Sequence, residues 1–186
     1  MIADLLRSRG RSQTIFTFGE IARITGRNAD ANLVSAISYY VRRKKLLRLA
    51  KGTYALDENY NKFELANKLR SPSYISLYSV LQEEGVVFQV YPAIFSVSNR
   101  SETVKIHRQD YRYRKIKDEI LLNPMGLREK QGVFRATPER AMLDKIYLDG
   151  GEYFDNLDSI DWQLVGVLNN HVYQSRRITK FMDKYA

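Results

Sequence analysis

Cysteine is absent from the 186 residues of this sequence, and its absence excludes several kinds of chemistry at once. Disulfides, thiolate metal sites and cysteine nucleophiles are all ruled out. Histidine is nearly absent too, because only His107 and His171 occur, and neither has carboxylates nearby at the spacing of metal ligands. We therefore expect both to be ordinary surface or strand histidines rather than general bases or ligands.

Motifs for nucleophiles and nucleotide cofactors are also missing. The chain contains no G-x-S-x-G elbow, no G-x-G-x-x-G loop and no P-loop. Asp155, Asp158 and Asp161 have a spacing that could suit Mg²⁺, but they fall near an expected helix start, where aspartate is a common capping residue. The sequence therefore predicts no enzyme activity, no cofactor and no metal site.

Long apolar runs are absent as well. No segment is long and apolar enough to span a bilayer, and the first 13 residues lack the apolar core of a signal peptide. The apolar fraction of 44% and the aromatic fraction of 12% are nevertheless typical of a folded chain. We expect a soluble, cytoplasmic protein without a membrane partner.

Acidic residues are scarce in the first part of the chain only. Residues 1–70 contain 14 Lys and Arg against 6 Asp and Glu, a net charge of +8, whereas residues 71–186 contain 16 and 15, a net charge of +1. Nearly all of the formal net charge of +9 therefore belongs to the first third of the sequence. Such asymmetry predicts an anionic partner for that part.

Residues 17–56 have the pattern of a helix–turn–helix followed by a two-stranded wing. Thr17 and Glu20 have the spacing of a capping box, Gly26 suits the left-handed end of a helix, and Asn28 or Asp30 can begin the next helix. A short helix over residues 1–9, with Arg11 just beyond it, and a strand over residues 13–16 should complete this domain. The order of elements favours nucleic-acid binding over a small helical domain with a solvated charged face.

The second of these helices should read DNA. Leu33, Ile37, Tyr40 and Val41 recur at the spacing of a buried stripe, so small and polar side chains fall on the opposite face, where a major groove could be approached. Basic residues follow at the helix end and on the wing, where phosphates could be held. The residues that we expect to contact DNA are Asn32, Ser35, Ser38, Tyr39, Arg42, Arg43, Lys44, Lys45, Arg48 and Lys51.

The whole chain is predicted to be α+β, with a winged helix–turn–helix domain over residues 1–58, a connecting helix and linker over residues 59–72, and a second domain over residues 73–186. The second domain should contain a small, mainly antiparallel sheet with helices. We expect helices over residues 73–85, 159–172 and 175–185, and a further helix that Thr137 caps and that Gly150-Gly151 ends. The expected strands cover residues 86–90, 93–98, 103–107, 109–116 and 132–136.

A second basic cluster occupies residues 100–117, with seven Lys and Arg against two acids. Tyr111 and Tyr113 alternate with its cations, so it could track a nucleic-acid backbone and stack bases. The alternative, which we favour slightly, is an exposed sheet edge whose charges prevent aggregation. The candidates for a second nucleic-acid patch are Arg108, Arg112, Arg114 and Lys115.

Four segments together resemble the AbiEi family, the antitoxins of abortive-infection type IV toxin–antitoxin systems. They are the proposed winged helix, Ser71-Pro72-Ser73-Tyr74-Ile75-Ser76-Leu77, Pro92-Ala93-Ile94-Phe95-Ser96-Val97 and Ala136-Thr137-Pro138-Glu139-Arg140-Ala141-Met142-Leu143-Asp144. The resemblance covers roughly residues 1–150, and residues from 152 onward have no match in it.

The resemblance implies a transcriptional repressor of its own operon that binds operator DNA and takes part in antiviral defence. Its partner would be a nucleotidyltransferase-like toxin, counteracted by the second domain without a stable complex, and the repressor could bind DNA as a dimer. Two alternatives stay open: a winged-helix-targeted nuclease or other nucleic-acid-modifying enzyme, with Glu139, Asp144 and Lys145 as its nearest candidate site, and a plain repressor without a toxin.

Overall fold

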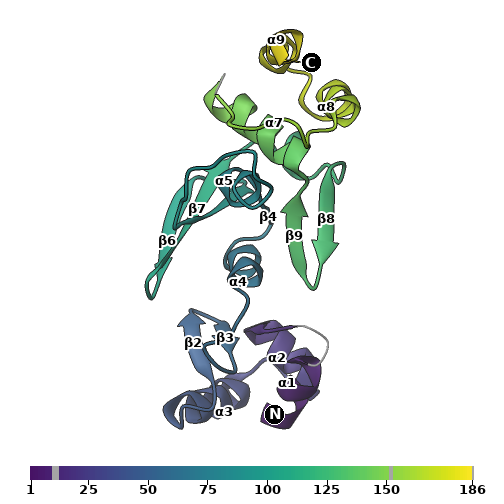
Figure 1. Ribbon diagram of the computed structural model, residues 1–186. Helices are drawn as coiled ribbons and strands as arrows, with labels where there is room; N and C mark the ends of the chain where they lie inside the picture. Colours follow the sequence, from purple (N-terminus) through teal and green to yellow (C-terminus); the bar gives the residue numbers. More distant parts are fainter. Residues whose placement is uncertain (10–12, 151–152, 186) are drawn as a thin grey trace. The chain divides into compact units, whose positions relative to one another are not determined.

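The protein folds into two compact α+β units, Met1–Leu69 and Arg70–Ala186, in a computed structural model (Figure 1). The structure describes residues 1–9, 13–150 and 153–185. Arg11, which follows the predicted first helix, and Gly151, at the predicted end of a later helix, lie outside these described residues. Among the described residues, no helix has the length and apolar character needed to cross a bilayer.

The first unit is a helical region with a small antiparallel sheet of strand order β1-β3-β2. Ile15 pairs with Ala55 and Leu47 pairs with Ala55 from the other side, so the early strand adds to the hairpin as a third strand. The elements are α1 (Ile2–Arg9), β1 (Ile15–Thr17), α2 (Phe18–Thr25), α3 (Ala31–Arg42), β2 (Leu47–Ala50), β3 (Thr53–Ala55) and α4 (Lys62–Leu69).

The ends of α2 and α3 follow the signals seen in the sequence. Thr17 and Glu20 form a reciprocal capping box at the start of α2, and Gly26 ends that helix with a φ of 63°. Asp30 begins α3, because its carboxylate accepts a hydrogen bond from Leu33 N at 3.0 Å. The turn between the helices is therefore fixed on both sides by local hydrogen bonds.

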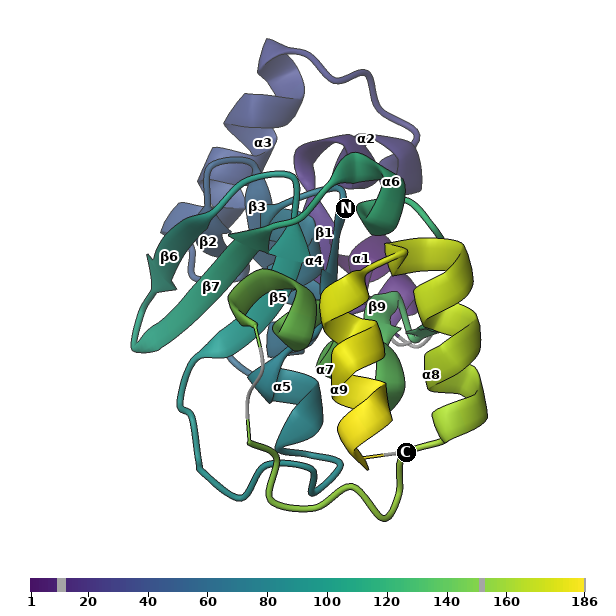
Figure 2. The same cartoon turned by 90° about the horizontal axis from the view of Figure 1, so that it is seen from above.

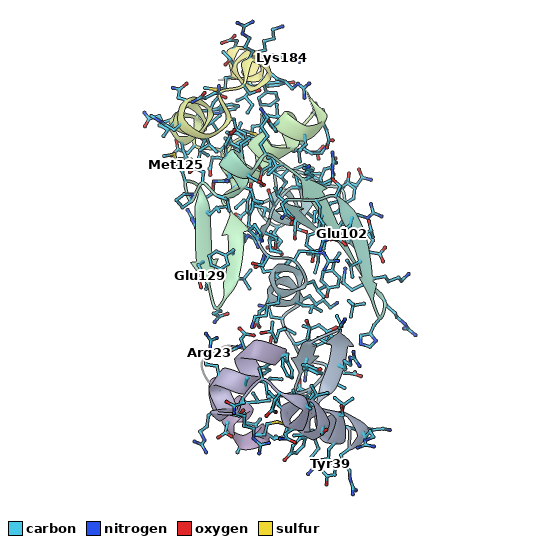
Figure 3. All side chains as sticks on the ribbon, turned by 180° about the vertical axis from the view of Figure 1, so that it is seen from behind. Arg23, Tyr39, Glu102, Met125, Glu129 and Lys184 are labelled. Carbon is cyan, nitrogen blue, oxygen red and sulfur yellow. The ribbon has the colours of Figure 1, made fainter. Side chains whose placement is uncertain are left out.

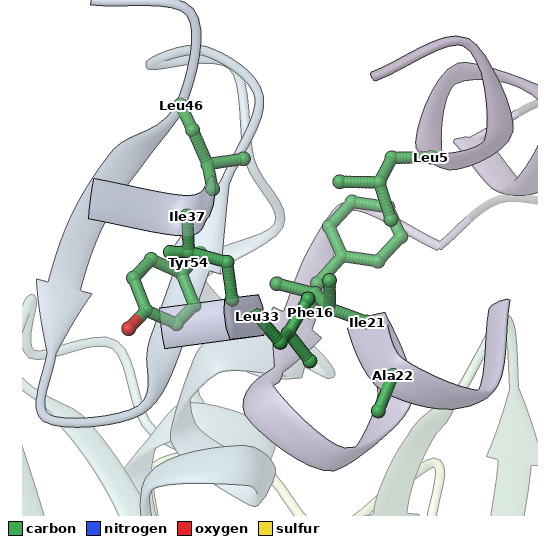
Figure 4. Close-up of a cluster of buried hydrophobic side chains, with 8 residues drawn as sticks. All are labelled: Leu5, Phe16, Ile21, Ala22, Leu33, Ile37, Leu46 and Tyr54. Carbon is green, nitrogen blue, oxygen red and sulfur yellow. The ribbon is translucent and has the colours of Figure 1, made fainter. Parts of the chain in front are cut away.

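A cluster of buried apolar side chains holds α1, α2, α3 and the sheet of the first unit together (Figure 4). Leu33 and Ile37 of α3 point into it and are at most 2% exposed, and burial of each stabilises the fold by about 1.5–3 kcal/mol. This burial fixes which face of α3 remains in solvent. The cluster consists of Leu5, Phe16, Ile21, Ala22, Leu33, Ile37, Leu46 and Tyr54.

Helix α4, expected to be a connector, is an integral part of the first unit. Its Glu64 is 1% exposed and accepts hydrogen bonds from Thr14 N at 2.8 Å and from Thr14 Oγ1 at 2.6 Å. Its Lys68 reaches the β1 carbonyl of Ile15 at 2.6 Å. The division between the units accordingly falls after Leu69.

The second unit is built on a mixed sheet with the strand order β6-β7-β5-β4-β9-β8 among the described residues. The pairs β5–β7 and β4–β9 are parallel, and the other three pairs are antiparallel. The strands are β4 (Ser73–Ile75), β5 (Ile94–Ser98), β6 (Glu102–Ile106), β7 (Gln109–Lys115), β8 (Leu127–Lys130) and β9 (Val133–Ala136).

Two helices of the second unit pack directly on this sheet, α5 on β5 and α7 on β9, and α8 and α9 pack on α7. Figure 2 shows α5, α7, α8 and α9 together in front of the strands. Thr137 caps α7 and Pro138 is its first residue, as the sequence predicted. The helical elements are α5 (Tyr78–Leu81), α6 (Asp118–Leu121), α7 (Pro138–Asp149), α8 (Trp162–Leu168), the π-helical segment η1 (Asn169–Tyr173) and α9 (Arg176–Tyr185).

Two predicted elements of the second unit were wrong. Residues 73–75, expected to be helical, form the central strand β4, because Tyr74 and Ile75 are buried between β5 and β9. A short buried strand and a helix face give similar apolar patterns. Residues 86–90 form no strand, because Val86 N donates to Leu81 O at 2.8 Å and so ends α5 instead.

Candidate nucleic-acid interface

The residues of α3 that the sequence predicts to contact DNA all lie on the solvent face of this helix. Because Leu33 and Ile37 are turned into the core, the opposite face of the helix is left exposed. Tyr39, at the outer side of α3 in Figure 3, is 48% exposed and meets the Tyr40 ring edge-on at 5.4 Å. The exposed face is made of Asn32, Ser35, Ser38, Tyr39 and Arg42.

The cations that follow this face are exposed as well and carry uncompensated charge. Arg43 lies over the Tyr39 ring, with Cζ 5.5 Å from the ring centroid. Within residues 1–9, 13–150 and 153–185, none of these cations forms an ion pair. Their charge is therefore available to an anion. The set is Arg42, Arg43, Lys44, Lys45, Arg48 and Lys51.

The backbone at the end of α3 gathers these cations into a small region. Lys44 has a φ of 54°, and Lys44 N and Lys45 N donate to the carbonyls of Val41 and Tyr40, each at 3.0 Å. This is a left-handed helix end of the kind that glycine usually forms. A lysine there costs the fold about 1 kcal/mol or more, and it turns the chain directly into β2 with its charge in solvent.

The β2–β3 hairpin places one further cation at its tip. Gly52 has a φ of 73°, which completes the tight turn after Lys51. Gly52 O accepts a hydrogen bond from Phe18 N at 2.8 Å, so the hairpin tip is tied to the start of α2. The pairing is irregular between Arg48 and Ala50, and a bulge there increases the local twist of the hairpin.

The four residues of the second predicted nucleic-acid patch have different surroundings in the structure. Arg114 is occupied by an ion pair, because its guanidinium reaches the Asp149 carboxylate at 2.6 Å. Arg112 lies over the Phe95 ring, with Cζ 5.6 Å from the centroid, and Arg108 is exposed in the turn between β6 and β7. Lys115 is exposed at the end of β7, on the face opposite to Arg112 and Arg114.

Sequence reasoning missed a cavity of about 180 Å³ beside Arg108 and Arg112. Tyr91, from the loop before β5, and Phe95 of β5 line it, and their rings meet edge-on with centroids 5.8 Å apart. The signal was present in the sequence, because Tyr91 and Phe95 flank a short apolar segment. Nothing in that pattern, however, shows that β7 lies beside β5 rather than elsewhere in the sheet.

The candidate residues for catalysis at α7 are buried in the second unit. Asp144 is 0% exposed and accepts hydrogen bonds from Ser76 Oγ at 2.6 Å, Tyr173 Oη at 2.7 Å and Tyr74 Oη at 3.1 Å. Burial raises the pKa of Asp144, against the opposing effect of Arg140 and the hydroxyl donors. Burial and the Asp144 carboxylate raise the pKa of Tyr74 and Tyr173 well above the ordinary value.

The other two candidate catalytic residues of α7, Glu139 and Lys145, have partners of their own. Glu139 accepts a hydrogen bond from Asp161 N at 3.3 Å, and Lys145 Nζ lies 2.9 Å from Asp149 Oδ2. The helix therefore directs Glu139, Asp144 and Lys145 to separate surroundings. In the part of the chain that the structure describes, no three metal-ligating side chains come close enough together to hold an ion.

A scan against protein-family models gives no match for this chain, and a search of curated proteins finds no relative. The features that bear on function are the residues themselves and the geometry of α3 and the β2–β3 hairpin.

Proposed function

We propose that the protein is a DNA-binding transcriptional autorepressor that acts as the antitoxin of a type IV toxin–antitoxin system. The first unit would be a winged helix–turn–helix that binds operator DNA, and the second unit would counteract a nucleotidyltransferase-like toxin. The observation that carries the DNA-binding part is the exposed face of α3 together with six cations, at the end of α3 and in the β2–β3 hairpin, that form no ion pairs among the described residues. The antitoxin part depends on the resemblance of four sequence segments to the AbiEi family.

The order of elements in the first unit supports a winged helix. Helices α2 and α3 are joined by a short capped turn, and the antiparallel hairpin β2–β3 follows α3 directly. With 12 residues, α3 is about 18 Å long, and an α-helix fits the major groove, which is about 12 Å wide. Asn32, Ser35 and Ser38 are short enough to let the helix axis approach the base edges.

In this mechanism the cations hold the backbone and the helix reads the bases. Arg43, Lys44 and Lys45 would bind phosphates beside the groove, and Lys51 would bind the backbone from the hairpin tip. If all six exposed cations neutralise phosphates, the plot of log affinity against log salt has a slope of about −5. Affinity should therefore fall steeply between about 50 and 200 mM salt.

The test is a gel shift of the full-length protein on the DNA upstream of its own gene, over a salt series. The variant Ser35→Ala/Arg42→Ala should lose sequence-specific binding. The variant Arg128→Ala is the control, because Arg128 is an exposed cation on β8, and it should bind like the wild type. Specific binding that the α3 variant retains, or that salt leaves unchanged, would contradict the proposal.

The antitoxin part has its own test. Expression of the neighbouring nucleotidyltransferase-like gene should arrest growth, and co-expression of the full-length protein should restore it. The Ser35→Ala/Arg42→Ala variant should still restore growth when expressed from an unrelated promoter, because neutralisation is assigned to the second unit. If this protein never restores growth, the proposal reduces to a plain repressor.

A nucleic-acid-modifying enzyme is the second candidate, with α7 as its source of catalytic groups. The buried positions of Asp144 and Lys145 favour a structural role for this helix over contact with a substrate. A metal-dependent cleavage assay on duplex and single-stranded substrates separates the two functions, since a repressor and antitoxin of this kind should cut neither.

A further inference from the structure

The cavity beside β5 and β7 combines aromatic rings with cations, and the proposed repressor function does not use it. Phe95 and Arg112 are directly paired positions of the parallel strands β5 and β7, so both side chains lie on the same face of the sheet. Lys105 of β6 and Arg108 of the β6–β7 turn line the cavity on its outer side. Tyr91 lines the opposite side, from the loop before β5.

The aromatic side of this cavity is held in place by a stack of rings. Tyr91 stacks on Tyr78 with centroids 4.1 Å apart and an interplanar angle of 20°, and both rings meet the edge of Phe95. Tyr91 N also donates to Gln82 Oε1 at 2.9 Å. Gln109 Nε2 donates to Pro92 O at 2.6 Å and so joins the loop to β7. The Tyr91 ring is thus positioned before any ligand arrives.

The cationic side of this cavity carries a net positive charge. Lys105, Arg108 and Arg112 face a single acid, Asp110, whose carboxylate is 3.9 Å from Lys105 Nζ in an exposed pair. Arg108 and Arg112 form no ion pair with any residue that the structure describes. The local charge is therefore +2, in a part of the chain whose net charge over residues 71–186 is only +1.

We propose that this cavity binds one nucleotide of a single-stranded nucleic acid, with the base against Tyr91 and the flanking phosphates at Arg108 and Arg112. Single-strand sites combine a basic track with aromatic rings on which bases stack. A volume of about 180 Å³ is below the range of roughly 300–1,000 Å³ that is usual for free ligands. The cavity therefore suits one unit of a chain that continues along the cations, rather than a free cofactor.

Duplex DNA does not fit this arrangement, because its bases are stacked inside the helix and cannot reach Tyr91. The site is therefore distinct from the α3 face, which would read a duplex. Unpaired bases of RNA loops and ends can be splayed onto aromatic side chains, and unpaired DNA presents the same base and phosphate chemistry. The cavity thus gives the second unit a nucleic-acid ligand of its own.

The test is fluorescence anisotropy of the full-length protein with labelled ten-nucleotide RNA and DNA of mixed sequence. All pocket variants are also made in an Arg42→Glu/Lys45→Glu background, which suppresses binding by the first unit. Arg108→Gln/Arg112→Gln should weaken single-strand binding at least tenfold and should make the salt slope shallower by about 1.4. The matched control is Arg128→Gln/Lys130→Gln, which removes two exposed cations from the opposite edge strand β8, and it should leave affinity unchanged.

The aromatic contact is tested by a pair of substitutions at one position. Tyr91→Leu should weaken single-strand binding roughly 5- to 150-fold, the range expected for loss of one stacked base, whereas Tyr91→Phe should keep near wild-type affinity. Thermal melts of both variants check that the second unit stays folded. Arg108→Gln alone, in an exposed turn, repeats the charge test without touching Phe95.

Three results would overturn the assignment. In the first, the pocket and control variants bind RNA and DNA alike. In the second, uridine monophosphate competes as well as the oligonucleotide, so that the occupant is a free nucleotide. In the third, the pocket variants lose affinity for operator duplex in parallel, so that the cations only extend the duplex footprint. Comparison of the affinities for the RNA and the DNA oligonucleotide shows which of the two single strands the cavity prefers.

Discussion

Lys68 of α4 donates hydrogen bonds to both carboxylate oxygens of Glu20 in α2, at 2.9 and 3.0 Å, across 48 positions of the chain. The same ammonium lies 3.2 Å from Glu64 Oε1. One cation therefore holds two carboxylates together, and the Glu64 side chain is only 1% exposed. The link fastens α4, the last helix of the first unit, to α2.

Removal of this ammonium should destabilise the first unit severely. In Lys68→Met the carboxylates of Glu20 and Glu64 would face each other without a cation, and breaking a buried pair costs about 3–5 kcal/mol. We expect a loss near the lower end of that range, because Lys68 is 16% exposed. Urea unfolding followed by circular dichroism measures it. Lys45→Met, the same change at an exposed lysine, should stay within about 0.5 kcal/mol of the wild type, and equal losses in the two variants would disprove the argument.

The ion pair between Glu20 and Lys68 predicts how the stability of the first unit depends on pH. Burial opposes ionisation of Glu20, but hydrogen bonds from Thr17 and the Lys68 ammonium outweigh it, so the pKa of Glu20 is lowered from 4.5. A carboxyl with a lowered pKa in the fold stabilises the protein above its unfolded-state pKa, and this contribution is lost as the pH falls through the folded-state value. When the melting temperature is measured from about pH 7 down to pH 3, it should therefore decrease once the pH is below 4.5. The decrease should be less steep in Glu20→Gln. Parallel profiles would show that Glu20 does not contribute.

Arg140 should be essential to the second unit. It is 0% exposed, and its guanidinium donates to the carbonyls of Ile120 at 2.6 Å, Asn123 at 2.7 Å and Met125. Arg140→Met would leave these carbonyls and Asp144 uncompensated, at a cost of about 3–5 kcal/mol. Arg140→Lys should recover only a minor part, because one ammonium cannot reproduce the planar fork. Chemical unfolding of both variants decides this, and full recovery by lysine would show that charge alone matters.

Gly126 provides a test of close packing against Arg140. Its φ is 72°, and a Cβ there would lie 3.1 Å from Arg140 Cβ and 3.1 Å from Leu168 Cδ2. Gly126→Ala should therefore add a steric cost to the backbone strain. Gly85→Ala is the matched control, because Gly85 has a φ of 69° and no atom within 4 Å of its would-be Cβ; it should lose about 1 kcal/mol from strain alone. Thermal melts that show equal losses would remove the packing argument.

Arg42 and Lys51 should differ in their effect on DNA binding. Arg42 lies on the face of α3 and Lys51 at the hairpin tip. Lys51→Gln should weaken binding to operator and to unrelated duplex by similar factors and reduce the salt slope by about 1. If the Arg42 guanidinium reaches a base edge, Arg42→Ala should weaken operator binding more than non-specific binding. The difference between the two losses should be about 1–3 kcal/mol. Competition assays with both DNAs separate the two roles, and a selective loss in Lys51→Gln would reverse the assignment.

Local signals predicted the first unit well because each acts over a few residues. The Thr17–Glu20 box, the Asp30 cap and the Leu33–Ile37 stripe all depend on spacings within one helix turn, and the structure confirms them. The buried stripe also fixed which side chains of α3 would be exposed. For this reason the candidate DNA-contacting face could be predicted without knowledge of any long-range contact.

The second unit was harder because its arrangement depends on long-range pairing. Nothing local shows that Ile75 pairs with Arg135, so the strand β4 was mistaken for part of a helix. The buried group around Asp144 was hidden for the same reason, because its hydroxyl donors come from β4, the turn after it and η1. The cavity at Tyr91 likewise forms only once β5 and β7 lie side by side.

The strand order of the second unit also has a consequence for how it folds. The hairpins β6–β7 and β8–β9 close over short turns, whereas the parallel pair β4–β9 joins Ile75 to Arg135. The entropy cost of closing a loop rises with its length, and non-local strand pairing slows folding. We therefore expect both hairpins to form early and the union of β4 with β9 to limit the rate, so substitutions at Ile75 should slow refolding more than substitutions in either hairpin turn.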